Sequence, residues 1–369
     1  MGARTTNQYE PDYVSPPGST LRETLEALRM TQRELAERTG RPVKTINEII
    51  TGKAAITSET ALQLERVLGT PASFWLNRER AYREHLARIK DAQRLAADVN
   101  VLGLVPVRDM IALGWIRAEK SKPSQVRAVL QFFGVATGKE LGEVCLNPVA
   151  DFRMSPSFKS APGAIAAWLR KGELEAQKVY CEPYDQKSFE QQLGDIRTLT
   201  REPDRTMDVV KLAAKAGVAV VFLPRVGKVT ASGAARWLSK DKSLIQLSLR
   251  YKSDDQVWFS FFHEAAHVLL HPKREVFVDM PRTDSDDYSR EKEEREADGF
   301  ASDFLIPPTE LEGFYNECDY RRETAVRRFA ERIGVSEGIV VGRMQHDKKV
   351  PWSHLNRLKG KFDWQCHQS

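Results

Sequence analysis

The chain has 369 residues, of which 41% are hydrophobic and 29% charged, with a net charge of +5. This length predicts two or three domains, and the composition excludes global disorder. No run of 18 uncharged apolar residues occurs, which excludes transmembrane helices, and the first residues lack the apolar core of a secretory signal. The four cysteines lie far apart without a CxxC pair, so we expect a reducing cytoplasm and no disulfide framework. The modest positive charge permits contact with nucleic acid without requiring it.

Helix signals dominate the N-terminal region. We expect a flexible arm over residues 1–15 and a five-helix domain over residues 16–98. Leu21, Leu25 and Leu28 share one face of the first helix, and Thr31 with Glu34 forms the pattern of a capping box at the start of the second. The other signals are Gly40 as a helix stop, Pro42 as the start of a third helix that ends at Gly52, Thr57 or Ser58 as the start of a fourth, and Pro71 as the start of a fifth that runs to about Asp98.

The stretch from Thr31 to Lys53 has the punctuation of a helix-turn-helix motif. It resembles the XRE-type repressors, and residues 16–85 resemble the HigA-type antitoxins more closely. The resemblance implies that Pro42–Ile50 is the recognition helix in the major groove of an operator, bound as a homodimer on palindromic half-sites. Its predicted base contacts are Val43, Lys44, Thr45 and Asn47, and its predicted phosphate contacts are Gln32 and Lys53.

Two alternatives to DNA reading stay open for this region. A generic helical bundle can contain the same glycine turn, and the fold could serve protein contacts alone. Local charge does not decide between them, because Glu34, Glu37 and Glu48 offset the basic residues. Residues 99–207 follow as a mostly helical linker or sensor region to which the sequence assigns no chemistry.

The hydrophobic period changes after Asp208. Strands are predicted over 218–223, 229–238 and 244–249, and helices over 254–270 and 289–305. We therefore expect an α+β domain over 208–312, followed by a basic helical region over 313–369. The whole chain is predicted to be mostly helical, with one small sheet.

The helix predicted over 254–270 contains His263-Glu264-Ala265-Ala266-His267, an HExxH motif. Histidines four residues apart lie one helical turn apart on one face, so both imidazoles can reach one metal ion. Glu264 can hold a zinc-bound water and accept its proton. The alternative is a helix with two histidines and a glutamate between them by chance.

A catalytic zinc needs a third protein ligand and one open position. His271 lies eight residues beyond His263, roughly 12 Å along the helix axis, which is too far to share the ion. The metzincin extension is absent, because its positions hold Leu270 and Lys273. A carboxylate from the next helix remains: Glu294 and Asp298 lie one turn apart, so one could bind the metal while the other orients a histidine.

Within the same acidic run, Glu296 points away from that face and is the weaker candidate. The alternative without a metal is that this acidic run is a solvent-exposed helix face. That interpretation fits Glu291 and Glu293 and remains open for Glu294.

The segments HEAAHVLLH and EREADGFASDFLIPP resemble the ImmA/IrrE metallopeptidases over about 209–312. The resemblance implies a gluzincin-like fold, in which a small mixed sheet packs on the HExxH helix and an edge strand near Leu244–Leu249 pairs with an extended substrate. It also implies a zinc ion held by His263, His267 and Glu294, with Glu264 as general base and Asp298 behind the ligands. Tyr288 and Arg290 remain open as stabilisers of the oxyanion.

These features predict a DNA-binding zinc metallo-endopeptidase that controls transcription. The resemblance implies cleavage of a repressor-like protein, or of the chain itself, in a stress or mobile-element response. The alternative function is a regulator or HigA-like antitoxin whose zinc domain is a sensor or scaffold. The substrate, the operator sequence and the activating signal cannot be derived from the sequence.

Overall fold

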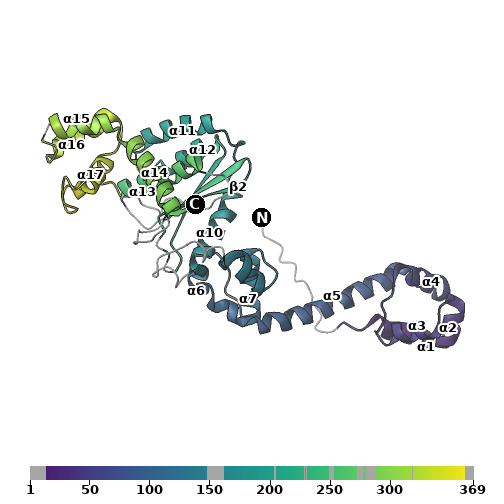
Figure 1. The fold of residues 1–369 in the computed structure, drawn as a ribbon. Helices are drawn as coiled ribbons and strands as arrows, with labels where there is room; N and C mark the ends of the chain where they lie inside the picture. The colour runs from purple at the N-terminus through teal and green to yellow at the C-terminus, as the bar shows by residue number, and fades with distance from the viewer. Residues whose placement is uncertain are drawn as a thin grey trace, which may run out of the picture. The chain divides into compact units, whose positions relative to one another are not determined.

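The computed structural model describes residues 14–147, 162–202, 205–227, 229, 231–248, 253–271, 277–279, 288–317 and 319–361 (Figure 1). The chain forms two compact units, residues 1–98 and 99–369. Residues 1–13 of the predicted arm lie outside the described residues. Within the described residues, each helix is either too short or too polar to span a bilayer.

The first unit contains the five predicted helices, and the prediction is confirmed. A threonine hydroxyl caps two of them: Thr31 accepts a hydrogen bond from the Glu34 backbone N–H, and Thr57 accepts one from Thr60. Only half of the predicted capping box forms, because the Glu34 carboxylate pairs with Arg38 instead. The helices are α1 Pro17–Ala27, α2 Gln32–Thr39, α3 Val43–Ile50, α4 Ser58–Leu68 and α5 Ala72–Ala97.

A small apolar core holds these helices together. Trp75 of α5 is fully buried in it. Helix α1 approaches α3 so closely that a Cβ on Gly18 would lie 2.2 Å from the Ile49 carbonyl oxygen, which only glycine avoids. Leu28 does not join the core as predicted; it is 51% exposed, because α1 ends at Ala27 and the helical period ends with it.

The second unit begins with the helical region that the sequence predicted. The first elements are η1 Val99–Gly103, α6 Val107–Ala112, α7 Lys122–Phe133, α8 Gly138–Glu140 and η2 Leu141–Leu146, and the next are α10 Pro162–Ala176, α11 Gln186–Leu199 and α12 Thr206–Ala214. Helices α10 and α12 both contact the first strand of the sheet, so this stretch packs directly on the domain that follows it.

A four-stranded mixed sheet with the order β1-β3-β2-β4 lies at the centre of the second unit. Strands β1 and β3 pair in parallel, whereas β2 pairs antiparallel with β3 and β4. The strands are β1 Val218–Leu223, β2 Gly233–Ser239, β3 Lys242–Ser248 and β4 Phe277–Asp279. The expectation of an edge strand near Leu244–Leu249 is wrong: β3 is hydrogen-bonded on both sides and buried on both faces, so it cannot receive a substrate strand.

Helices cover both faces of this sheet. On one face, Gln246 of β3 donates a hydrogen bond to the Trp168 carbonyl of α10, and Arg236 of β2 donates one to the Leu169 carbonyl. On the opposite face, Ala235 and Ile245 join the apolar core that packs against α13, Asp254–Leu270. The alternation of side chains along each strand thus places α13, the HExxH helix, on one defined face.

Two of the remaining helices pack on α13. Helix α14, Tyr288–Leu305, runs beside it, and α17, Glu337–His346, packs on it (Figure 1). The other elements are α15 Pro308–Glu317, α16 Glu323–Ile333 and η3 Asn356–Leu358. A segment far along the chain secures the start of α13: Lys359 Nζ lies 2.6 Å from Asp255 Oδ2, and Lys361 forms a β-bridge with Ser253.

Candidate metal centre

Helix α13 places the HExxH side chains in the interior of the second unit. The helix is predicted by its apolar residues and is buried on almost every side, with Phe261 and Phe262 in the main core. The exposed fractions of His263, Glu264 and His267 are 2%, 0% and 1%. Buried polar groups of this kind require partners, and the neighbouring helix α14 provides several of them.

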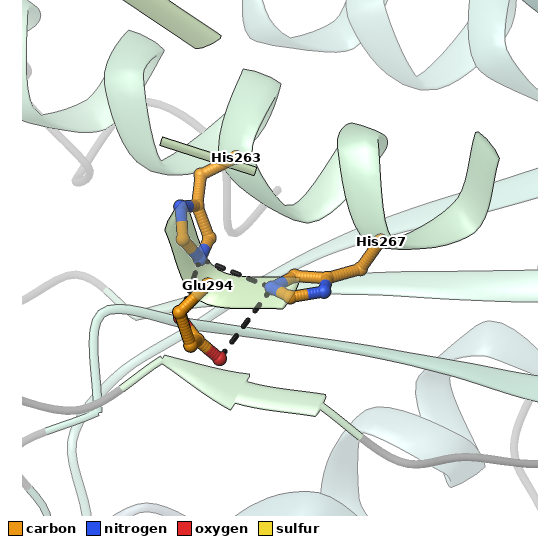
Figure 2. Close-up of side chains that lie close together, drawn as sticks. All are labelled: His263, His267 and Glu294. Carbon is orange, nitrogen blue, oxygen red and sulfur yellow. Dashed lines mark hydrogen bonds and ion pairs between the residues drawn. The ribbon is translucent and has the colours of Figure 1, made fainter. Parts of the chain in front are cut away.

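Three side chains converge in the geometry of a metal site (Figure 2). One ligand atom from each of His263, His267 and Glu294 lies within 4.8 Å of the others. The two Nε2 atoms are 3.1 Å apart, and the Glu294 oxygens lie 3.2 Å from His263 Nε2 and 3.6 Å from His267 Nε2. Zinc bonds of about 2.0–2.1 Å in a tetrahedron would separate the ligand atoms by about 3.3 Å, so these donors fit one zinc ion.

Helix α14 contributes two carboxylates, and they contact different nitrogens of one imidazole. Glu294 lies at His263 Nε2, on the side of the cluster. Asp298, one turn further along α14, places Oδ1 3.0 Å from His263 Nδ1. When Nδ1 carries the proton and donates a hydrogen bond to Asp298, Nε2 keeps its lone pair for a metal.

Glu264 lies outside this group of three, against strand β2. The carboxylate is fully buried, and a Cβ on Gly233 would lie 2.4 Å from its Oε1. Any side chain at position 233 would therefore displace the carboxylate or the strand. Gly233 carries no recognisable motif in the sequence, and its importance emerges only from the packing of β2 under α13.

His271 is not a ligand of the three-residue cluster, as its position along the helix predicted. It nevertheless contacts a member of that cluster, because its Nδ1 lies 2.8 Å from His267 Nδ1. Its Nε2 lies 3.3 Å from Glu296 Oε2. Glu296 thus supports His271 rather than the metal position. Sequence reasoning missed these contacts, although the four-residue spacing from His267 to His271 would have indicated the first of them.

The predicted DNA contacts gather at the start of α3, after the turn in which Gly40 has a φ of 66°. Val43, Lys44 and Asn47 are exposed, and Thr45 is half-buried. Lys44 has an 85% exposed side chain, with Nζ 3.9 Å from Glu48 Oε1. Gln32 at the start of α2 is half-buried, and Lys53 after α3 is exposed. The role of these residues in binding DNA stays a prediction. The side chains of Tyr288 and Arg290 lie outside the described residues.

Two family models match the chain, one in each unit. The helix-turn-helix model matches residues 21–75, and the model of the IrrE N-terminal-like domain, a peptidase M78 family, matches residues 213–345. The second match contains α13, α14 and all four strands of the sheet. Both agree with the resemblances drawn from the sequence.

Similar proteins match the first unit. The uncharacterized HTH-type transcriptional regulator YddM of Escherichia coli strain K12 is 36% identical over 66 residues, which are 18% of this chain and 70% of that protein. A HigA-family addiction module antidote protein of Coxiella burnetii is 32% identical, covering 23% of this chain and 94% of that one, with a TM-score of 0.22. The Pseudomonas aeruginosa antitoxin HigA, solved with the higBA promoter, is 27% identical, covering 22% and 89%, with a TM-score of 0.21.

Proposed function

From the premise that the chain belongs to the helix-turn-helix transcriptional regulators and carries an IrrE N-terminal-like domain of the M78 peptidases, we propose that it is a DNA-binding zinc metallo-endopeptidase. The observation that carries this proposal is the convergence of His263, His267 and Glu294 beside a buried Glu264. Two imidazoles, one carboxylate and a neighbouring base are the donor set of a hydrolytic zinc site with one open position.

When bound, zinc would polarise the scissile carbonyl and lower the pKa of a coordinated water towards neutrality. The side chains of the protein divide the remaining work. Glu264 accepts the proton of the attacking water and passes it to the leaving amine. Asp298 fixes the tautomer of His263. His271 Nδ1 accepts a hydrogen bond from His267 Nδ1–H, and His271 Nε2 donates one to Glu296.

The helix-turn-helix unit would bring this peptidase to an operator. Exposed residues at the start of α3, chiefly Lys44 and Asn47, would contact bases, and two copies would bind palindromic half-sites as a homodimer. We propose a repressor-like protein, or the chain itself, as the substrate, with cleavage altering transcription during stress or mobile-element induction. Operator binding requires the compartment that contains the DNA, so the cytoplasm stays the expected location.

A non-proteolytic regulator is the second candidate, because the curated relative matches the helix-turn-helix unit alone and is described as a transcriptional regulator. In that case the zinc domain would act as a sensor or scaffold. Glu264 favours the peptidase, since a purely structural zinc site prefers four protein ligands and needs no base beside them.

The test compares zinc-loaded wild-type protein with Glu264→Gln. Each is incubated with candidate repressors and alone, with and without operator DNA, and fragments are identified by mass spectrometry. We expect the wild type to cut at a defined bond, and Glu264→Gln to keep its zinc while losing at least about 10²-fold in rate, the contribution of one general base. If both proteins give the same fragments, or if neither gives any fragment, the peptidase proposal fails and the non-proteolytic regulator remains.

A further inference from the structure

A cavity of about 260 Å³ lies between helices of the second unit, and its nearest lining residues are one helical turn from residues of the metal centre. Its walls come from α13, α14, α17, the residue before β2 and the segment after α17. Five of the lining side chains are large and apolar: Phe259, Leu305, Ile306, Ile339 and Trp352. The cavity is smaller than the roughly 300–1,000 Å³ of sites for whole drug-sized ligands, so it suits one side chain better than a cofactor.

Each element that builds the metal centre continues directly into this cavity. Phe259 lines it one turn before His263, and the two rings lie 6.2 Å apart. Ser260 precedes Glu264 by one turn, and Ser302 follows Asp298 by one turn. Ser232, also in the wall, adjoins Gly233, on which the Glu264 carboxylate packs. One helical turn is about 5.4 Å, which is within reach of a side chain next to the bond being cut.

The charges in the wall are paired within the protein. Asp255 lies 2.6 Å from Lys359 Nζ, and Arg343 Nε lies 2.9 Å from an oxygen of Asp347. Each of these charges therefore already has an opposite charge beside it, although Asp255 Oδ1 and Arg343 Nη1 have no hydrogen-bond partner among the described residues. Trp352 is 64% exposed, an unusual position for a large aromatic side chain unless it covers something apolar.

We propose that this cavity is a specificity subsite of the peptidase, and that it receives a large apolar side chain, such as Leu, Met or Phe, from a residue flanking the scissile bond. The proposal rests on the proposed peptidase activity and adds the substrate class to it. The polypeptide that the protein cuts would then carry an apolar residue at the cut, in a segment that is accessible in its folded state.

The experiment profiles cleavage sites of the full-length, zinc-loaded protein on a tryptic peptide library from a bacterial proteome. Ser302→Leu and Gln256→Leu each narrow the cavity from a different helix, and Asp303→Leu adds the same side chain at an exposed neighbouring position. Zinc content and thermal unfolding establish that each variant is folded. Two cavity variants are used so that the result does not depend on one of them folding.

We expect the wild type and Asp303→Leu to favour Leu, Met or Phe at one flanking position. The cavity variants should lose about 10-fold or more on those peptides and retain cleavage beside Ala or Ser, because an extra methylene in an apolar pocket changes selection by this factor. If all variants cleave with the same profile, or if the wild type shows no preference for apolar residues, the subsite proposal is overturned and the peptidase proposal stands. No cleavage by the wild type overturns both.

Discussion

The two units present their functional side chains in opposite ways. In the first unit, the predicted DNA-contacting residues Val43, Lys44 and Asn47 are exposed on α3, and the structure beneath them only has to hold one helix in place. In the second unit, His263, Glu264 and His267 are almost completely buried; the two histidines contact each other and α14, and Glu264 lies against β2. Local signals therefore suffice to recognise a surface motif, whereas a buried centre depends on partners that the sequence does not place.

The substitution with the largest expected effect tests whether the two units unfold independently. Trp75→Ala removes a fully buried indole from the core of the first unit, which should destabilise that unit by about 3–5 kcal/mol. Calorimetry should show one unfolding transition shifted or lost and the other unchanged, with zinc content intact. Phe74→Ala, at a residue that is 39% exposed, is the matched control. Loss of zinc in Trp75→Ala would contradict the division into two units.

The second prediction concerns a buried charge in the second unit. Burial, with help from the Asp255 carboxylate, raises the pKa of Asp254 from 3.8 to about 6. The folded state then binds a proton that the unfolded state releases, so stability should fall by ~3 kcal/mol as the pH rises from about 4 to about 6. Asp254→Asn should remove this loss, leaving the variant more stable than the wild type at pH 7 and equal to it near pH 4.

Urea unfolding at several pH values measures this effect. The exposed Asp303→Asn is the control and should not change the pH profile. A parallel pH profile for Asp254→Asn and the wild type would contradict the assignment.

The third prediction concerns the close approach of Gly233 to Glu264, the proposed catalytic base. Gly233→Ala would place a methyl group against the Glu264 carboxylate, and a displacement of about 1 Å should reduce cleavage by on the order of 10². Gly299→Ala, on α14 with no atom within 4 Å of the new Cβ, is the control and should cleave normally. Zinc content and cleavage rate are measured together. Normal cleavage by Gly233→Ala would show that Glu264 does not need this position.

The fourth prediction concerns the contact that supports His267, a proposed metal ligand. His271→Ala removes the acceptor for His267 Nδ1, and zinc affinity should fall by about 10–100-fold. Competition with a chromogenic chelator gives the affinity directly, without reference to cleavage. His354→Ala, at an exposed histidine of the same unit, should bind zinc like the wild type. If His271→Ala binds zinc with wild-type affinity, the contact between His271 and His267 does not support the metal site.

The smallest predicted effect belongs to the exposed residues. Lys44→Ala and Asn47→Ala should each weaken operator binding by about 1–3 kcal/mol if they contact bases. Fluorescence anisotropy on operator DNA at fixed salt measures the change, and both variants should keep wild-type zinc content and unfolding. Glu37→Ala on the exposed face of α2 serves as the control. If both variants bind operator DNA with wild-type affinity, the base contacts are made by other residues.

Much of the fold could be predicted because its signals are local. Thr31, Thr57 and Gly40 mark the helix ends of the first unit, and the HExxH spacing places two histidines on one helix face. The inner position of β3 could not be predicted, because the pairing of strands depends on which distant segments meet. For the same reason the sequence did not indicate that Gly233 lies against Glu264 or that Glu296 supports His271.

The attachment of Lys359 and Lys361 to the start of α13 has a consequence for biosynthesis. The ribosome adds about 5–20 residues per second, so Lys359 is made roughly 5–20 s after Asp255, which precedes it by 104 positions. The N-terminal unit can therefore fold and emerge from the exit tunnel well before the motif helix acquires its final tether. If the proposed function is tested on ribosome-bound chains, we expect the helix-turn-helix unit to be folded before the proposed metal centre is complete.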